Sequence, residues 1–134
     1  MDKYKITKSE FDDYKKKTTE EKIKFVYGRF FNEYENCGYY FRHLYRILKF
    51  VDKQKEEDID SKNDNKYLEF VQFIQAQMST KEMLIVFYNS FIFPKAKELI
   101  IKYKLLENLT EENLSRPEHK EFSLEFGMKS KDDI

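Results

Sequence analysis

Residues 79–93 read STKEMLIVFYNSFIF, and this stretch decides the fold class. By composition alone, the apolar run from Met83 to Phe87 is compatible with a buried strand. Ser79 and Glu82, however, have the spacing of a capping box, in which each side chain satisfies a free backbone N–H at the start of a helix. The apolar residues then continue for longer than a typical strand. The stretch therefore predicts a helix that is apolar nearly all round.

The chain on both sides of this stretch repeats the helical spacing. Thr18 and Glu21 form a second capping box, and the helix that follows them is expected to end near Gly38. The segment 40–51 has one apolar stripe, made of Tyr40, Leu44, Ile47, Leu48 and Val51. The segment 67–78 carries Phe70 and Phe73 on a second face, so we expect it to be covered on two sides. Further helices are expected near 9–17, from Pro94 and from Pro117.

These segments predict an all-α fold, a compact bundle of about six helices with one polar loop near 53–66. Only 3 Gly and 2 Pro are present, too few for a turn-rich β-sandwich. A length of 134 residues predicts a single helical domain over 1–134, with 1–17 peripheral or partly flexible. The helices near 67–78 and 80–93 should form its centre.

Composition excludes several classes of function. The single cysteine, Cys37, excludes an intrachain disulfide framework, and His43 and His119 form no spaced ligand pair, so we expect no metal and no cofactor. Lys+Arg and Asp+Glu are both 25, which argues against coating nucleic acid by bulk charge. The longest apolar run is too short to span a membrane, and the N-terminus has no signal-peptide core. We therefore expect a soluble, cytoplasmic protein.

Four cations lie on one face of the segment 40–51 and the residues just after it. They are Arg42, Arg46, Lys49 and Lys53, at i, i+4, i+7 and i+11. No acid occurs between residues 38 and 51, and His43 flanks the line. One interpretation is a binding strip for RNA, a phosphorylated ligand or an acidic partner. The other is the solvated side of an amphipathic helix, neutralised by neighbours such as Glu33, Glu35 or the loop acids.

Asn89 is the remaining candidate for the binding site, because a buried amide must find a partner. It either bonds a neighbouring helix or lines a pocket with residues such as Arg46. Catalytic residues are not identifiable. Small helical ribonucleases of prokaryotic defence systems use an Arg and a His four to six residues apart. Here Arg42 and His43 are adjacent, and Arg116 and His119 are closer than that spacing.

The segment 39–52, YYFRHLYRILKFVD, resembles the opening motif of the putative phage abortive infection proteins. The segment 76–82, AQMSTKE, with Leu84 and the residues 87–89 resembles the second motif, and the similarity covers roughly residues 38–109. This similarity implies that the family's motif residues correspond to Arg42, Tyr45, Arg46, Gln77, Ser79, Glu82, Tyr88 and Asn89. The chain departs from the family at Gln75, where an Arg is expected. Many relatives carry membrane-spanning helices ahead of this domain, so this chain would be a soluble version or work with a separate partner.

The resemblance implies a bacterial role in phage defence but supplies no catalytic residues. Our first hypothesis is a soluble binding module whose basic helix face contacts an anionic ligand, RNA or a protein partner. Two alternatives stay open. One is a metal-independent ribonuclease-like toxin, and the other is a plain helical module that forms homodimers or docks through aromatics such as Tyr39, Phe91 or Phe93.

Overall fold

The computed structural model describes residues 6–31, 37–58 and 65–129, and within these ranges the fold is all-helical. The elements, in chain order, are α1 (Lys8–Lys15), α2 (Thr19–Val26), the π-helix η1 (Tyr27–Phe31), α3 (Cys37–Glu57), α4 (Asn65–Gln75), α5 (Thr80–Ser90), α6 (Pro94–Lys102) and the 3₁₀-helices η2 (Glu111–Asn113) and η3 (Pro117–Phe122). No strand occurs in the described ranges, where β-pairing is limited to an isolated bridge between Thr110 and Lys129. The prediction of about six α-helices is confirmed.

Three helices begin at a side-chain cap. Thr18 and Glu21 form the predicted reciprocal box at the start of α2, and the Ser79 hydroxyl accepts a hydrogen bond from the Glu82 N–H, 3.1 Å away, at the start of α5. The first helix begins at the box of Thr7 and Glu10 rather than at Ser9. Each cap supplies an acceptor to an N–H that has no partner within the helix.

One predicted boundary is wrong, because Gly38 lies in the first turn of α3 instead of ending the preceding helix. The polar stretch near 53–66 contains the end of α3, which continues to Glu57, and the start of α4 at Asn65. Residues 53–57 are all Lys, Gln or Glu, which are good helix formers even without an apolar stripe. Asp52 also ties this end of α3 to α6 through Lys102 and Tyr103.

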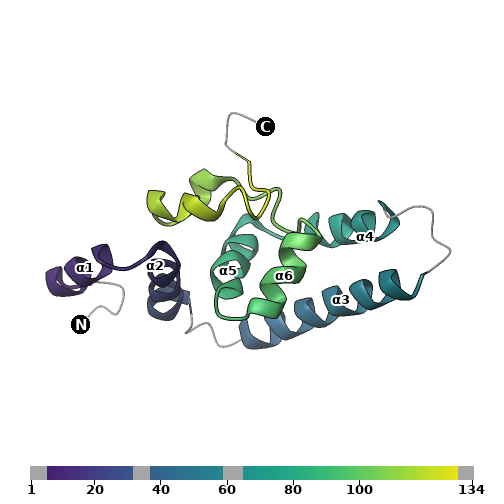
Figure 1. Ribbon diagram of the computed structural model, residues 1–134, viewed down its shortest axis with the longest axis horizontal. Coiled ribbons are helices and arrows are strands. Elements are labelled where there is room, and N and C mark those ends of the chain that lie inside the picture. The colour runs from purple at the N-terminus through teal and green to yellow at the C-terminus, as the bar shows by residue number, and fades with distance from the viewer. Residues whose placement is uncertain (1–5, 32–36, 59–64, 130–134) are drawn as a thin grey trace.

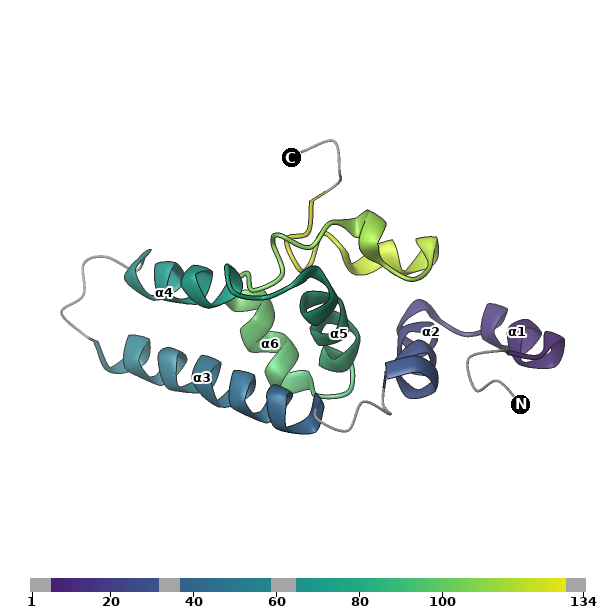
Figure 2. The ribbon, with the colours of Figure 1, turned by 180° about the vertical axis from the view of Figure 1, so that it is seen from behind.

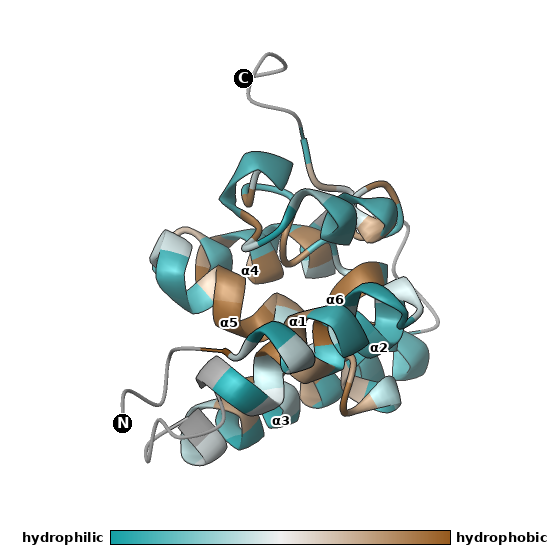
Figure 3. Ribbon diagram, turned by 90° about the vertical axis from the view of Figure 1, so that its left-hand side faces the viewer, coloured by the Kyte–Doolittle hydropathy of each residue, from teal (hydrophilic) through white to brown (hydrophobic). Residues whose placement is uncertain are grey.

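The hydrophobic core is centred on α5. Every residue of that helix from Ile85 to Ser90 is buried, and α5 packs against α2, η1 and α6. Leu48 of α3, Val71 of α4 and Ile100 of α6 belong to the same core. Figures 1 and 2 show α5 and α6 in the middle of the molecule, with α1 and α2 at one end and the antiparallel pair α3 and α4 at the other. Figure 3 shows hydrophobic residues gathered on the inner sides of these helices.

The exposed large side chains differ in part from the prediction. Phe91 is buried against Phe87, Phe122 and Phe126, so it cannot serve as an exposed docking aromatic. Tyr39 and Phe93 are exposed, as expected. The prediction that α4 is covered on two sides is wrong, because Phe70 and Phe73 both face solvent. Leu44, Leu48 and Val51 form the core stripe of α3, whereas Ile47 is partly exposed.

Candidate functional site

The predicted cations form a continuous exposed row along α3. Leu44, Leu48 and Val51 turn one side of this helix toward the core, and helical geometry places the cations on the opposite side. All of them are exposed, namely Arg42, Arg46, Lys49 and Lys53. We call these four residues the cation row. His43 is also exposed and flanks the row.

Arg42 is the member of the row whose side chain is held in place. Its Nε donates to the Gly38 carbonyl at 3.3 Å, and its guanidinium lies 4.9 Å from the centre of the Tyr39 ring. A guanidinium that is stacked on an aromatic ring keeps its outer N–H groups free to bind an anion. The turn at the start of α3 therefore orients an arginine toward solvent.

Within the described ranges, no acid neutralises the row. Arg46, Lys49 and Lys53 lie in no ion pair there. Asp52 is engaged elsewhere, since it accepts from Lys102 Nζ at 2.6 Å and from the Tyr103 hydroxyl at 2.7 Å. The bond from Lys102 holds the pKa of Asp52 below its usual value. Of the loop acids, Asp58 pairs with Lys66, and Glu56 and Glu57 at the end of α3 lie in no ion pair within the described ranges. The other proposed neutralising acids, Glu33, Glu35, Asp60 and Asp64, lie outside those ranges.

Asn89 does not lie on the exposed face that holds the cation row. It is buried on α5, and its Nδ2 donates to the Tyr27 hydroxyl of η1 at 2.9 Å. This bond meets the amide's need for a partner in the way that the structural interpretation predicted. Gln75, at the end of α4, is also buried, and its Nε2 has no hydrogen-bond partner among the described residues.

The start of α3 is connected to the start of α5. The Tyr40 hydroxyl donates to Glu82 Oε2 at 3.0 Å, while Oε1 of the same carboxylate accepts from the Ser79 hydroxyl at 3.2 Å. Burial and the adjacent carboxylate raise the pKa of Tyr40. The Glu82 carboxylate therefore bonds both Ser79, which caps α5, and Tyr40 of the helix that carries the cations.

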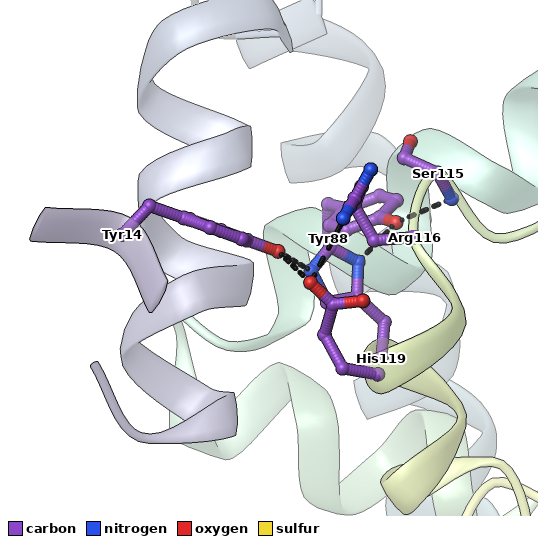
Figure 4. Close-up of polar contacts among 6 residues, drawn as sticks. Tyr14, Tyr88, Ser115, Arg116 and His119 are labelled. Carbon is purple, nitrogen blue, oxygen red and sulfur yellow. Dashed lines mark hydrogen bonds and ion pairs between the residues drawn. The ribbon is translucent and has the colours of Figure 1, made fainter. Parts of the chain in front are cut away.

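A second polar cluster is buried around His119 (Figure 4). The Tyr14 hydroxyl of α1 lies 2.9 Å from His119 Nε2, and the Tyr88 hydroxyl of α5 lies 2.8 Å from Nδ1. Tyr14 also donates to Glu118 Oε1 at 2.8 Å, and the Tyr88 oxygen accepts the N–H of Ser115 at 2.8 Å. The network joins α1, α5 and η3, which are far apart in the sequence.

These bonds indicate which nitrogen of His119 carries the proton. Because the Tyr14 proton goes to Glu118, its oxygen accepts from Nε2, so Nε2 carries the proton of the imidazole. Nδ1 is then the acceptor for the Tyr88 hydroxyl. Burial lowers the pKa of His119 to about 4, which makes the ring neutral at pH 7. With both nitrogens bonded in the interior, the ring is held as a structural connector.

Sequence analysis missed this network. The only signals were the apolar spacing of Phe11 and Tyr14 and the nearness of Arg116 to His119. Arg116 is exposed and contacts Glu118, with 3.3 Å between its Nε and Oε1. Among the described residues, no group of three or more His, Cys, Asp or Glu side chains could hold a metal ion.

In the part of the chain that the structure describes, the geometry therefore defines a small all-helical protein with an exposed cationic helix face, which forms no ion pair there, and a buried histidine network. The family model for putative phage abortive infection protein matches residues 32–114, and the chain belongs to that family. The match covers α3 to α6 and the cation row, whereas Tyr14, Glu118 and His119 lie outside it. Searches of curated proteins and of solved structures gave no match. No helix in the described ranges is long and apolar enough to cross a membrane.

Proposed function

We propose that this protein acts in bacterial phage defence, in the cytoplasm, by binding an anionic ligand or partner through the cation row and His43. The observation that carries the proposal is the row itself: four cations exposed on one helix face, with no ion pair among the described residues. Solvated surface cations of a protein with zero net charge usually lie among acids. Here Asp52, the acid that lies between Lys49 and Lys53 in the sequence, bonds Lys102 of α6 instead.

The test is phage plating efficiency on a host that expresses the chain. We expect the wild type to reduce plating and Arg42→Ala with Arg46→Ala to restore it, because the variant lacks half of the row. The matched control is Lys16→Ala with Lys95→Ala, which removes two exposed cations from α1's end and α6. Thermal melting of all purified proteins checks that each variant is folded. Equal protection by wild type and both variants would contradict a role for the row, and no protection by the wild type would contradict the defence role.

A metal-independent ribonuclease is an alternative function, which an assay of RNA cleavage without added metal would test. No observation favours it. His119 is buried, with Tyr14 and Tyr88 on its two nitrogens, and a general acid or base must reach its substrate. Homodimer formation is a separate alternative, which light scattering at several concentrations tests.

A further inference from the structure

Two pairs of large apolar side chains are exposed on α3 and α4. Ile47 and Phe50 of α3 are 40% and 62% exposed, and Phe70 and Phe73 of α4 are 52% and 67% exposed. Within each pair the residues are three apart, so they are neighbours on one side of their helix. Scattered single apolar residues need no explanation, but a group of this size indicates an interaction surface.

The contacts of α4 place Phe70, the first residue of its exposed pair, on the flank of this helix toward α3. Gln72 Nε2 lies 3.4 Å from Glu107 Oε1, in the segment that follows α6. Phe70 is two residues earlier, about 200° around the helix, and so lies on the opposite flank. One turn before it, the Tyr67 hydroxyl donates to Asp58 Oδ2 at 2.6 Å, just beyond the end of α3. This flank of α4 therefore borders α3.

The contacts of α3 place its exposed pair on the side of α4. Asp52 points to Lys102 and Tyr103 of α6. Phe50 is about 200° from Asp52 around the helix, and Ile47 about 140°, so both lie on the part of α3 that is turned away from α6. The carbonyl oxygen of Gln54, on this same side, lies 3.3 Å from the Tyr67 hydroxyl oxygen of α4. The antiparallel course of the two helices is visible in Figures 1 and 2.

We propose that this α3–α4 face, defined by Ile47, Phe50, Phe70 and Phe73 together with the cation row, binds an acidic amphipathic helix of a partner protein. The inference rests on the proposed function, since it takes the same cations as the contact. A helix laid along α3 would pack its apolar stripe on the four apolar side chains. Its acids, on one flank, would meet the cations.

The distribution of charge on the α3–α4 face favours an acidic amphipathic helix as its binding partner. The row extends about 16 Å along α3 at about 1.5 Å per residue, which is three turns of a helix lying parallel to it. The cations border the apolar side chains on the α3 side, whereas the exposed polar residues of α4 are mixed and include Lys66, Glu69 and Gln72. A helix with one acidic flank and one apolar stripe is complementary to this arrangement.

Three other occupants fit less well. An anionic membrane surface is matched best by cations on all sides of the apolar residues. RNA would use the cations but leave Phe70 and Phe73 on α4 uncovered. A second copy placed by a two-fold axis on the same face would bring together two faces of the same sign.

The test is selection of 20-residue helical peptides, randomised at their surface positions, on the immobilised full chain. We expect enrichment of peptides with apolar residues at i, i+3 or i+4 and i+7 and with acids on one flank. For an enriched peptide, fluorescence anisotropy should show at least tenfold weaker binding to Phe50→Asp with Phe73→Asp, and to Arg42→Ala with Arg46→Ala. The control, Phe93→Asp with Leu124→Asp, changes two other exposed apolar residues and should bind as the wild type does.

Several results would overturn the inference. The first is enrichment of basic or uncharged peptides. The second is that selection on the wild type enriches no peptide more than selection on the variant with Phe50→Asp and Phe73→Asp. The third is that an enriched peptide binds that variant as tightly as it binds the wild type. Binding of phosphatidylglycerol vesicles or of a 12-nucleotide oligouridylate that depends on Phe50 and Phe73, in the absence of peptide binding, would also overturn it. None of these results would contradict the proposed function if loss of Arg42 and Arg46 still abolished phage protection, so the two failures are distinguishable.

Discussion

At the scale of single residues, replacing each of the two histidines by alanine should have very different effects on the free energy of unfolding. His119→Ala leaves the Tyr88 hydroxyl without its acceptor and opens a cavity between α1, α5 and η3, so we expect a loss of about 3 kcal/mol in the free energy of unfolding. His43→Ala, on the exposed face of α3, should change that free energy by less than about 0.5 kcal/mol. Urea denaturation followed by circular dichroism measures both. A small effect of His119→Ala would mean that the buried network contributes little to stability.

The same scale shows why the cation row could be predicted from the sequence and the histidine network could not. Arg42, Arg46, Lys49 and Lys53 share a face because of helical spacing, which is a local property of the chain. Tyr14 and His119 are 105 residues apart, and no periodicity relates them. Their contact exists only because α1 and η3 both pack against α2 at one end of the bundle.

At the scale of elements, the cap of α5 is a point where local sequence sets the position of a core helix. Ser79→Ala removes the acceptor of the Glu82 N–H, and we expect it to cost about 1 kcal/mol of folding free energy. Thr80→Ala, one residue further on, is the control, because Thr80 is exposed and is not the cap. Chemical denaturation of the two variants gives the comparison. Equal stabilities would show that the remaining contacts of Glu82, including the bond from Tyr40, hold this end without the cap.

The segments that form helices could be predicted from the sequence. Which faces of each helix are covered by other helices could not. Capping boxes and apolar spacing predicted α2 and α5 because both signals lie within a few residues. The exposure of Phe70 and Phe73 depends on which other helices reach α4, and α4 has a neighbour on the flank of Tyr67 and another near Gln72 but none over its outer side within the described residues.

At the scale of the whole molecule, the two candidate regions have different physical characters. The cation row lies on the surface and within the part that matches the family, so its contribution should be to binding. The network around His119 is buried and connects the first helix to the last 3₁₀-helix, so its contribution should be to the integrity of the fold. The unfolding equilibrium of the whole chain is therefore the quantity that reports on the network.

That equilibrium should depend on pH through His119. Burial lowers the pKa of His119 from 6.5 to about 4, so between these values the unfolded chain binds more protons than the folded one. Stability from this residue is then fully present above pH 6.5 and is lost as the pH falls toward 4. From pH 7 to pH 5 we expect the wild type to lose about 1–2 kcal/mol more than His119→Gln, whose amide does not titrate. Urea denaturation at both pH values measures this difference, and because the carboxylates are common to both proteins, parallel losses in the two would mean that His119 keeps an ordinary pKa in the fold.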